Sequence, residues 1–191
     1  MEVLRRSMRD RRRALDEATR SHAARSVARL ALPLLDGVRT LGAYVAVGGE
    51  VDPAPIIEVA WQRGITVFVP RITAGYSMVF GEWKRDAPKR PGRFGVPEPD
   101  YDAVVRPASR LDAVLVPLVA FDRAGTRLGT GAGFYDRAFA FRLGQPRGSR
   151  PILVGLAYRW QESAHLERRP WDVPLDYVVT DGELVHCVAT T

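Results

Sequence analysis

Two largely apolar runs, Leu111 to Val116 and Ile152 to Ala157, constrain the fold of this chain more than any other feature. Neither run alternates polar with apolar residues, and this pattern is typical of strands that are buried on both faces of a sheet. Such strands lie parallel to one another and need long crossover connections, which are usually helices. The chain has 191 residues, 46% of them hydrophobic, which is enough for such a core. The runs therefore predict an α/β fold.

Helical and extended segments alternate around these two strands. Helices are predicted from Glu2 to Leu35, Pro53 to Gln62 and Phe134 to Leu143, and further strands from Thr40 to Val47, Ile65 to Val69 and Tyr177 to Thr180. This order predicts one domain over residues 1–191, with a mostly parallel sheet, right-handed crossovers and helices on both faces. Residues 84–99 contain four prolines and two glycines, and we expect a loop or flap there.

Composition limits the classes of function. No window approaches the ~18 consecutive apolar residues that a membrane span needs, and no apolar stretch follows the basic N-terminus as it does in a secretory signal. Cys187 is the only cysteine, so no disulfide can form within the chain, which fits the reducing cytoplasm. The net charge of +6 favours anionic ligands, either nucleic acid or small molecules.

An arginine-rich N-terminal segment leaves both ligand classes open. Six of the nine residues from Arg5 to Arg13 are arginines, but the whole chain is biased, because Lys84 and Lys89 are its only lysines. A solvated helix face is the plain interpretation of such a run. A nucleic-acid surface would need base-reading aromatic or polar residues among the arginines, and none is interleaved.

The clearest functional signal is a glycine-rich loop between a buried strand and a predicted helix. Gly129, Gly131 and Gly133 alternate there, and Arg127 and Arg137 flank them. Glycines let backbone N–H groups approach an anion closely, and the N-terminus of a helix adds positive partial charge. The loop therefore favours a phosphate site, and a plain glycine-rich turn is the alternative.

Asp136 follows this loop in the first predicted helical turn. A carboxylate there can either stabilise the helix dipole or bind Mg²⁺ beside a phosphate. Two familiar nucleotide motifs do not match. The Walker pattern needs a lysine that the loop lacks, and the dinucleotide pattern needs two residues where only Ala132 separates the last glycines.

The segment Arg127-Leu-Gly-Thr-Gly-Ala-Gly-Phe-Tyr-Asp-Arg137, preceded by Leu115-Val-Pro-Leu-Val-Ala-Phe-Asp122, closely resembles the signature of the 5-formyltetrahydrofolate cyclo-ligase family. Shorter matches follow the family's order: Leu4-Arg5, Tyr44, Glu50-Val51-Asp52, Val69-Pro70-Arg71, Phe94-Gly-Val-Pro-Glu-Pro99 and Trp171-Asp172-Val-Pro-Leu175. The chain departs from the family pattern at Thr130 and Ala132. The resemblance implies a fold similar to that of the sugar-phosphate isomerase and CoA-transferase group.

The resemblance also implies a reaction, namely ATP- and Mg²⁺-dependent cyclisation of 5-formyltetrahydrofolate to 5,10-methenyltetrahydrofolate, with release of ADP and phosphate. It implies catalytic roles for Arg127 and Asp136, and it makes Asp136 and Asp172 the Mg²⁺ ligands. The implied ATP contacts are Arg5, Arg127, Leu128, Gly129, Thr130, Gly131, Ala132, Gly133, Phe134 and Tyr135. The implied folate contacts are Tyr44, Val45, Glu50, Phe94, Thr130, Gly131, Gly133 and Phe134.

Taken without the resemblance, several of these residues have plainer roles. Glu50 is then a turn carboxylate at the end of a strand, Phe94 an anchor for a loop, and Asp172 a cap for its local turn. Two rival functions also stay open: a nucleic-acid binder that uses the arginine-rich helix, and a folate- or nucleotide-binding relative without turnover. The favoured expectation is a monomeric enzyme with small-molecule substrates and neither nucleic acid nor membrane as a partner.

Overall fold

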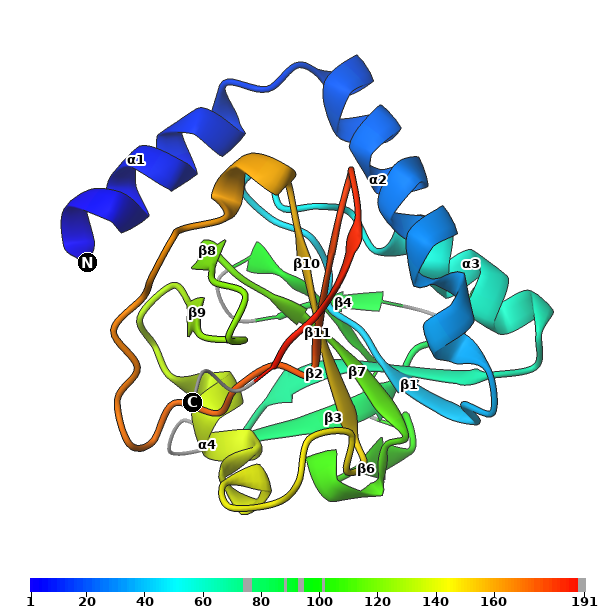
Figure 1. Cartoon of the computed structure of the whole chain (residues 1–191). Helices are drawn as coiled ribbons and strands as arrows, with labels where there is room; N and C mark the ends of the chain where they lie inside the picture. The colour runs from blue at the N-terminus through cyan, green and yellow to red at the C-terminus, as the bar shows by residue number, and fades with distance from the viewer. Residues whose placement is uncertain (74–76, 88, 93–94, 101, 189–191) are drawn as a thin grey trace.

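The computed structural model describes residues 1–73, 77–87, 89–92, 95–100 and 102–188, and a mixed sheet forms its centre (Figure 1). The strands of this sheet are β1 (Thr40–Gly42), β2 (Thr66–Ile72), β3 (Met78–Glu82), β6 (Val105–Arg106), β7 (Ala113–Pro117), β10 (Ile152–Ala157), β11 (Tyr177–Thr180) and β12 (Leu184–His186). They lie in the order β12-β11-β10-β7-β1-β2-β3-β6. The central strands from β11 to β2 are parallel, while β12, β3 and β6 pair antiparallel with their neighbours. The predicted mostly parallel α/β sheet is thus confirmed.

Helices and short hairpins surround the sheet. The α-helices are α1 (Glu2–Arg13), α2 (Glu17–Ala31), α3 (Ala54–Gln62) and α4 (Phe134–Ala138). The 3₁₀ helices are η1 (Leu32–Leu35), η4 (Ala108–Arg110), η5 (Ala140–Arg142) and η6 (Arg159–Gln161). Two hairpins stand outside the main sheet, β4 (Lys89–Pro91) with β5 (Pro97–Pro99), and β8 (Ala120–Phe121) with β9 (Arg127–Leu128). No helix in the described ranges has the length and apolar character to cross a membrane.

Helices lie on both faces of the sheet because successive strand residues point to opposite sides. Ala113 and Leu115 of β7 pack into one cluster with buried residues of α2 and α3, such as Val27 and Ile56. The residue between them, Val114, packs on the other face, together with Phe139 after α4. A strand that is apolar on both sides needs both covers, which explains the unbroken apolar pattern of β7 and β10.

The N-terminal helix is shorter than the sequence predicts. One helix was expected from Glu2 to Leu35, but the chain turns between α1 and α2 at residues 14–16. Asp16 is extended there, and its carboxylate accepts a hydrogen bond of 2.7 Å from the backbone N–H of Thr19. This N-cap starts a second helix. The break lets α1 leave the face that α2 covers and lie near the β8–β9 hairpin and the loops that follow β7 and β1 (Figure 1).

Two other boundaries also differ from expectation. The strand predicted from Thr40 to Val47 ends at Gly42, because the chain leaves the sheet there to form a loop. The helix predicted from Phe134 to Leu143 ends at Ala138 and continues as the 3₁₀ helix η5. A five-residue helix has few aligned peptide dipoles, so the expected contribution of its N-terminus to anion binding is small.

The predicted flap, residues 84–99, is partly an ordered hairpin. Strands β4 and β5 pair antiparallel, and Arg90 donates a hydrogen bond of 2.6 Å to the buried carboxylate of Glu98. Gly81 of β3 lies so close that a Cβ there would meet Pro99 at 3.0 Å, so the hairpin packs onto the sheet. Phe94, the implied folate contact, lies outside the described residues.

Candidate functional site

The candidate site lies at the carboxyl ends of β1 and β7, two neighbouring parallel strands from which the chain continues toward opposite edges of the sheet. From β1 the chain continues through α3 to β2 on one side, and from β7 it continues to β10 and β11 on the other. Loops that follow such a pair of strands separate and leave a crevice outside their carboxyl ends, which is where ligands bind in open α/β sheets. The loop with Glu50 follows β1, and the glycine-rich loop follows β7 through the β8–β9 hairpin.

The glycine-rich loop is open on its outer side. A Cβ at Gly129 or Gly131 would meet no atom within 4 Å, and Gly131 has φ of +108°, which other residues rarely adopt. Within the described chain, the backbone N–H groups of residues 129–133 donate no hydrogen bond. The loop therefore presents a row of unused donors beside open space, which is the arrangement that a phosphate needs.

Two arginines hold this loop through its carbonyl oxygens. Arg5 of α1 donates from Nε to the carbonyl of Gly129 at 2.9 Å. Arg137 donates from Nη2 to the carbonyl of Ala132 at 2.7 Å, and its guanidinium lies 5.5 Å from the ring centre of Phe134. Both of these bonds use carbonyl oxygens of the loop and none of its N–H groups. Arg5, an implied ATP contact, thus lies beside the loop although the two are 124 residues apart in the sequence.

Arg127 is engaged within the protein rather than free to reach a ligand. Its side chain is only 5% exposed, and Nη2 lies 2.6 Å from Oδ1 of Asp136. Its Nη1 also donates to the carbonyl of Val173, whose own N–H donates to the same Asp136 oxygen at 3.2 Å. The sequence suggested that Arg127 neutralises phosphate directly. The geometry instead makes it the residue that fixes Asp136 against the turn at Val173.

Asp136 and Asp172 come together at this turn, because Val173 follows Asp172 directly. Asp172 caps its turn as the plain interpretation expected, accepting from the N–H of Arg169 at 2.8 Å. Each aspartate uses one oxygen in these contacts. No group of three or more His, Cys, Asp or Glu side chains that could hold a metal occurs among the described residues. Two carboxylates suit Mg²⁺ bound largely by phosphate oxygens and water.

Glu50 lies in a tight loop that is built against α1. Gly48 and Gly49 have φ of +59° and +78°, and a Cβ on Gly49 would lie 2.7 Å from the backbone oxygen of Arg12. The carboxylate of Glu50 accepts from the N–H of Val47 at 3.2 Å, and Nη1 of Arg12 lies 3.7 Å from its other oxygen. Burial raises the pKa of Glu50, and the Arg12 charge opposes that rise.

Tyr135 connects the glycine loop with the Glu50 loop. Tyr135, which follows the glycine loop, has a buried hydroxyl without a hydrogen-bond partner in the described structure. Its pKa is raised chiefly by burial and then by the charge of Glu50. Because the charge of Glu50 acts on Tyr135, the end of the glycine loop lies near the Glu50 loop.

Tyr44 supports the Glu50 loop from the buried side and is not exposed to a ligand. It is 3% exposed, and its hydroxyl donates to the carbonyl of Val51 at 2.5 Å. Val45 is half-buried against the same core. The sequence did not single out Tyr158, whose hydroxyl donates to Gly49 at 3.2 Å, or Arg12. Arg12 was one of six similar arginines, and no local pattern distinguishes the buried one.

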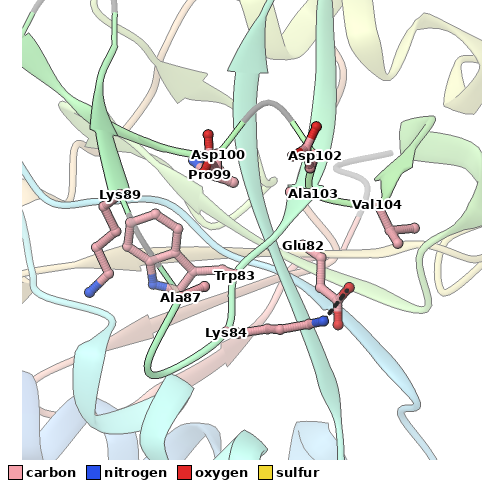
Figure 2. Close-up of a pocket in the computed structure, with 10 residues that line it drawn as sticks. All are labelled: Glu82, Trp83, Lys84, Ala87, Lys89, Pro99, Asp100, Asp102, Ala103 and Val104. Carbon is pink, nitrogen blue, oxygen red and sulfur yellow. Dashed lines mark ion pairs between the residues drawn. The ribbon is translucent and has the colours of Figure 1, made fainter.

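Two hollows on the surface lie away from this site. One of about 220 Å³ and one of about 590 Å³ share Glu82, Trp83 and Lys84, near the amino end of β2. Figure 2 shows the smaller one, where Lys84 lies 3.6 Å from Glu82 and Lys89 approaches the ring of Trp83. Charges of both signs line it, and the carboxyl-end loops that hold Glu50 and the glycines do not contribute.

Several arginines of α1 make contacts within the protein, although Arg6, Arg11 and Arg13 are exposed. Arg5 and Arg12 contact the body of the molecule, Arg11 lies over the ring of Trp160 at 4.3 Å, and Arg13 pairs with Asp10 at 3.8 Å. Leu4 and Met8 pack against a small cluster around the β8–β9 hairpin. The helix is therefore docked on the site, and this use of its arginines weakens the nucleic-acid interpretation.

Known proteins resemble this chain over almost its whole length. A model of the 5-formyltetrahydrofolate cyclo-ligase family matches residues 1–181. The 5-formyltetrahydrofolate cyclo-ligase of Escherichia coli is 34% identical over 183 residues, covering 93% of this chain and 98% of the relative. That of Haemophilus influenzae is 35% identical over 159 residues, covering 80% and 82%.

Solved structures give the same result for the fold. The 5,10-methenyltetrahydrofolate synthetase of Aquifex aeolicus superposes with a TM-score of 0.83 at 27% identity, covering 100% of this chain and 94% of that one. The 5,10-methenyltetrahydrofolate synthetase of Mycoplasma pneumoniae superposes with a TM-score of 0.75, covering 94% and 98%, and at 23% identity it supports the fold alone.

Proposed function

The chain belongs to the 5-formyltetrahydrofolate cyclo-ligase family, and from this premise we propose that it is a ligase that converts 5-formyltetrahydrofolate and ATP to 5,10-methenyltetrahydrofolate, ADP and phosphate. The formyl oxygen attacks the terminal phosphorus and ADP leaves. The neighbouring secondary amine of the folate then attacks the activated carbon and loses its proton. Phosphate departs with its bonding electrons, and the methenyl bridge remains. No step needs a nucleophile from the protein.

The ATP half of the proposal rests on the glycine-rich loop. Phosphoryl transfer depends on donors placed around the oxygens that gain charge, and fixed backbone amides meet that need. The loop from Gly129 to Gly133 offers unused N–H groups, and Arg5 is near enough to contribute positive charge. Arg127 works through position, because it fixes Asp136 and the turn at Val173.

Asp136 and Asp172 would hold Mg²⁺ between the loop and the turn. When bound, the ion would neutralise charge on the phosphate oxygens during transfer. The protein's own part is to keep two carboxylates at one turn, with Asp136 fixed by Arg127 and Val173. The donor set suits an ion that arrives with ATP.

The folate half rests on Glu50. A carboxylate can accept two parallel N–H donors, as it does from a guanidinium, and the amino and amide N–H groups of a pterin offer such a pair. Tyr44 and Tyr158 fix the loop around Glu50 from within. Phe94 and Val45 would flank the ring. The whole chain acts as one catalytic domain in this proposal, and its buried single thiol suits a cytoplasmic location.

The observation that carries the proposal is that an open glycine loop, residues 129–133, and the buried carboxylate of Glu50 follow the neighbouring parallel strands β7 and β1. Its direct test is absorbance detection of methenyltetrahydrofolate from 5-formyltetrahydrofolate, ATP and Mg²⁺. Product should form only when all three are present, and chelation of the metal should stop it. A folded protein that forms no product under any of these conditions would refute the cyclo-ligase proposal.

A second measurement tests the pocket. The change Glu50→Gln should weaken folate binding by roughly 10- to 100-fold, since a charge-assisted hydrogen bond contributes about 1.5–3 kcal/mol. Binding of ATP should change little. Calorimetric titration of each ligand separates the two effects, and a loss confined to ATP would show that the pocket is assigned wrongly.

A further inference from the structure

Arg12 is the buried arginine of α1, and it spans the divergence between β1 and β7. It is 3% exposed, although it belongs to a helix whose other arginines are half-buried or exposed. Its Nη1 donates to the carbonyl of Leu118, just after β7, at 3.1 Å. The same nitrogen lies 3.7 Å from the carboxylate of Glu50, in the loop after β1. One guanidinium thus reaches both walls of the crevice.

Stability alone does not account for this arrangement. Removing two charges from water costs several kcal/mol each, and an apolar pair of similar size is often as stable as a buried ion pair or more so. Arg12 is also incompletely satisfied, because its buried Nε has no partner among the described residues. Burial lowers the pKa of Arg12, and the charge of Glu50 is the main factor that opposes this. A buried ion pair with an unsatisfied guanidinium nitrogen is weak evidence of a purely stabilising role.

The geometry of the pair leaves Glu50 able to bind a ligand. One carboxylate oxygen accepts from the N–H of Val47 at 3.2 Å. The oxygen nearer Arg12, at 3.7 Å, is beyond hydrogen-bond distance, and in the described part of the chain it accepts no other bond. Arg12 therefore supplies charge without using the lone pairs of that oxygen. A bidentate pairing would have used both oxygens.

We infer that Arg12 is a positioning residue that keeps Glu50 ionised and fixed at the β1–β7 divergence, so that the N–H donors of the folate ring meet a charged acceptor. This inference rests on the proposed role of Glu50 as the folate contact. The role of Glu50 as a folate contact does not by itself say what controls the charge of the pocket. The inference assigns that control to helix α1. Arg12 touches neither folate nor ATP in this scheme.

The electrostatic surroundings give the sign of the pH effect. Burial raises the pKa of Glu50, and Arg12, then the Val47 N–H, then Arg9 lower it. The other groups that face Glu50 are the hydroxyls of Tyr44 and Tyr135, which stay neutral because burial raises both of their pKa values. Without Arg12 the pKa of Glu50 must rise further. Folate binding needs the ionised form of Glu50. As the pH falls, binding in a protein without Arg12 should therefore begin to weaken at a higher pH than in the wild type.

The test compares Arg12→Met, Arg12→Lys and the control Arg13→Gln, an adjacent arginine whose side chain is 60% exposed. We expect Arg12→Met to raise KM for folate roughly 10- to 100-fold, as loss of a charge-assisted contact does, with KM for ATP within about twofold of wild type. Its folate KM should begin to rise at a higher pH than in wild type. Arg12→Lys, which keeps the charge, should restore most of the pH profile, and Arg13→Gln should match wild type.

A double-mutant cycle with Glu50→Gln separates this inference from the proposed function. If Arg12 acts through Glu50, Arg12→Met should have little further effect once Glu50 is neutral. A Glu50→Gln variant with normal folate binding would refute the assignment of the pocket. A weakened Glu50→Gln variant combined with a normal folate KM and pH profile in Arg12→Met would overturn the role of Arg12 alone. Equal loss for ATP and folate in Arg12→Met would overturn it too.

The wild-type protein supplies a measurement that does not depend on how the variants fold. Carbon-13 titration of the glutamate carboxyls, with Glu50→Gln used for assignment, reports the charge of Glu50 directly. We expect an ionised Glu50 throughout the pH range in which folate binds. A protonated Glu50 in that range would overturn the inference even if Arg12→Met did not fold.

Discussion

Asp136 makes two contacts that a residue capping a short helix would not need, and both bring it to the turn beside Asp172. We predict that Asp136→Asn lowers turnover by about a hundred- to thousandfold, because the change keeps the shape and removes the charge that Mg²⁺ needs. Turnover and melting temperature should be measured on the same preparations. The matched control is Asp16→Asn, which should leave both unchanged, since asparagine caps helix α2 as well as aspartate does. Normal turnover in Asp136→Asn, with only a lower melting temperature, would reduce Asp136 to a structural cap.

Cys187 is the one thiol of the chain, and it is 1% exposed. Burial raises the pKa of this thiol to about 12, an effect that the charge of Arg147 only partly opposes. Because the thiolate is the reactive form, we predict that an aromatic disulfide reagent does not label the native protein at neutral pH. Labelling should follow unfolding in denaturant with the same midpoint as circular dichroism. Rapid stoichiometric labelling of the folded protein would contradict this.

The sequence predicts individual residues well where a local pattern marks them. The alternating glycines and the carboxylate after Gly48-Gly49 are such cases, and in the structure both lie in loops that follow neighbouring parallel strands, β7 and β1. Arg12 could not be predicted, because its burial depends on contacts with Leu118 and Glu50 that lie far along the chain. The paired state of Arg127 is hidden for the same reason, since its partner carbonyl at Val173 is 46 residues away.

At the scale of elements, Asp176 ties the start of β11 to the segment after α4. Its carboxylate receives two bonds from Arg142, at 3.0 and 3.1 Å, and one each from the N–H groups of Gly148 and Leu153. Both charged side chains are almost fully buried, at 4% and 1% exposure. We predict that Asp176→Ala lowers the free energy of unfolding by about 3–5 kcal/mol, because the charge of Arg142 is left buried and unpaired.

The control for this prediction is an ion pair of similar length on the surface. Arg63 and Asp36 are 3.3 Å apart but 40% and 79% exposed. Removing Asp36 with alanine should change the free energy of unfolding by about 0–1 kcal/mol, since water screens an exposed pair. Urea denaturation measures both variants. Equal effects would mean that burial does not decide the strength of these pairs.

Helix α1 docks through Leu4 and Met8, which pack around the β8–β9 hairpin, and it carries Arg5 and Arg12 into the site. We predict that the double change Leu4→Ala and Met8→Ala raises KM for both ATP and folate, because the helix positions a residue in each half. Hydrogen exchange should speed up in residues 2–13 and stay slow in β7 and β10. Unchanged exchange in α1 would show that these two side chains do not hold the helix.

Element boundaries were harder to predict than element types. The break between α1 and α2 depends on the capping bond of Asp16, in a stretch that otherwise reads as continuous helix. The first strand ends early because Gly42 leads into a loop that packs against α1, which no strand pattern encodes. By contrast, β10 and β11 have the predicted bounds, because an apolar run with clear ends defines each of them.

At the scale of the whole molecule, the parallel core of the sheet follows from the sequence and its edges do not. Strands β7 and β10 are apolar throughout because helices cover both faces. The edge strands β12 and β6 are three and two residues long and largely exposed, so they carry no hydrophobic periodicity. Short edge strands give little signal in a sequence, although they limit pairing with other molecules.

Ligand binding should stabilise the entire fold, because the site joins elements from both halves of the chain. We predict that a non-hydrolysable ATP analogue with Mg²⁺, at 100 times its dissociation constant, adds about 2.7 kcal/mol to the free energy of unfolding. Thermal melting with and without a chelator measures this. Duplex DNA is the control for the arginine-rich helix and should give no shift. An equal shift with DNA would favour the nucleic-acid interpretation.

The long-range contacts of α1 also affect the order in which the protein forms during synthesis. Arg5 and Arg12 reach partners 124 and 106 residues further along the chain. Helix α1 therefore leaves the ribosome more than 100 residues before the segments that it binds. Closing so long a loop carries a large entropic penalty and comes late in folding. The nascent chain can thus build its sheet before it can bind ATP or folate, and catalytic competence begins only when α1 returns to the segments that follow β7.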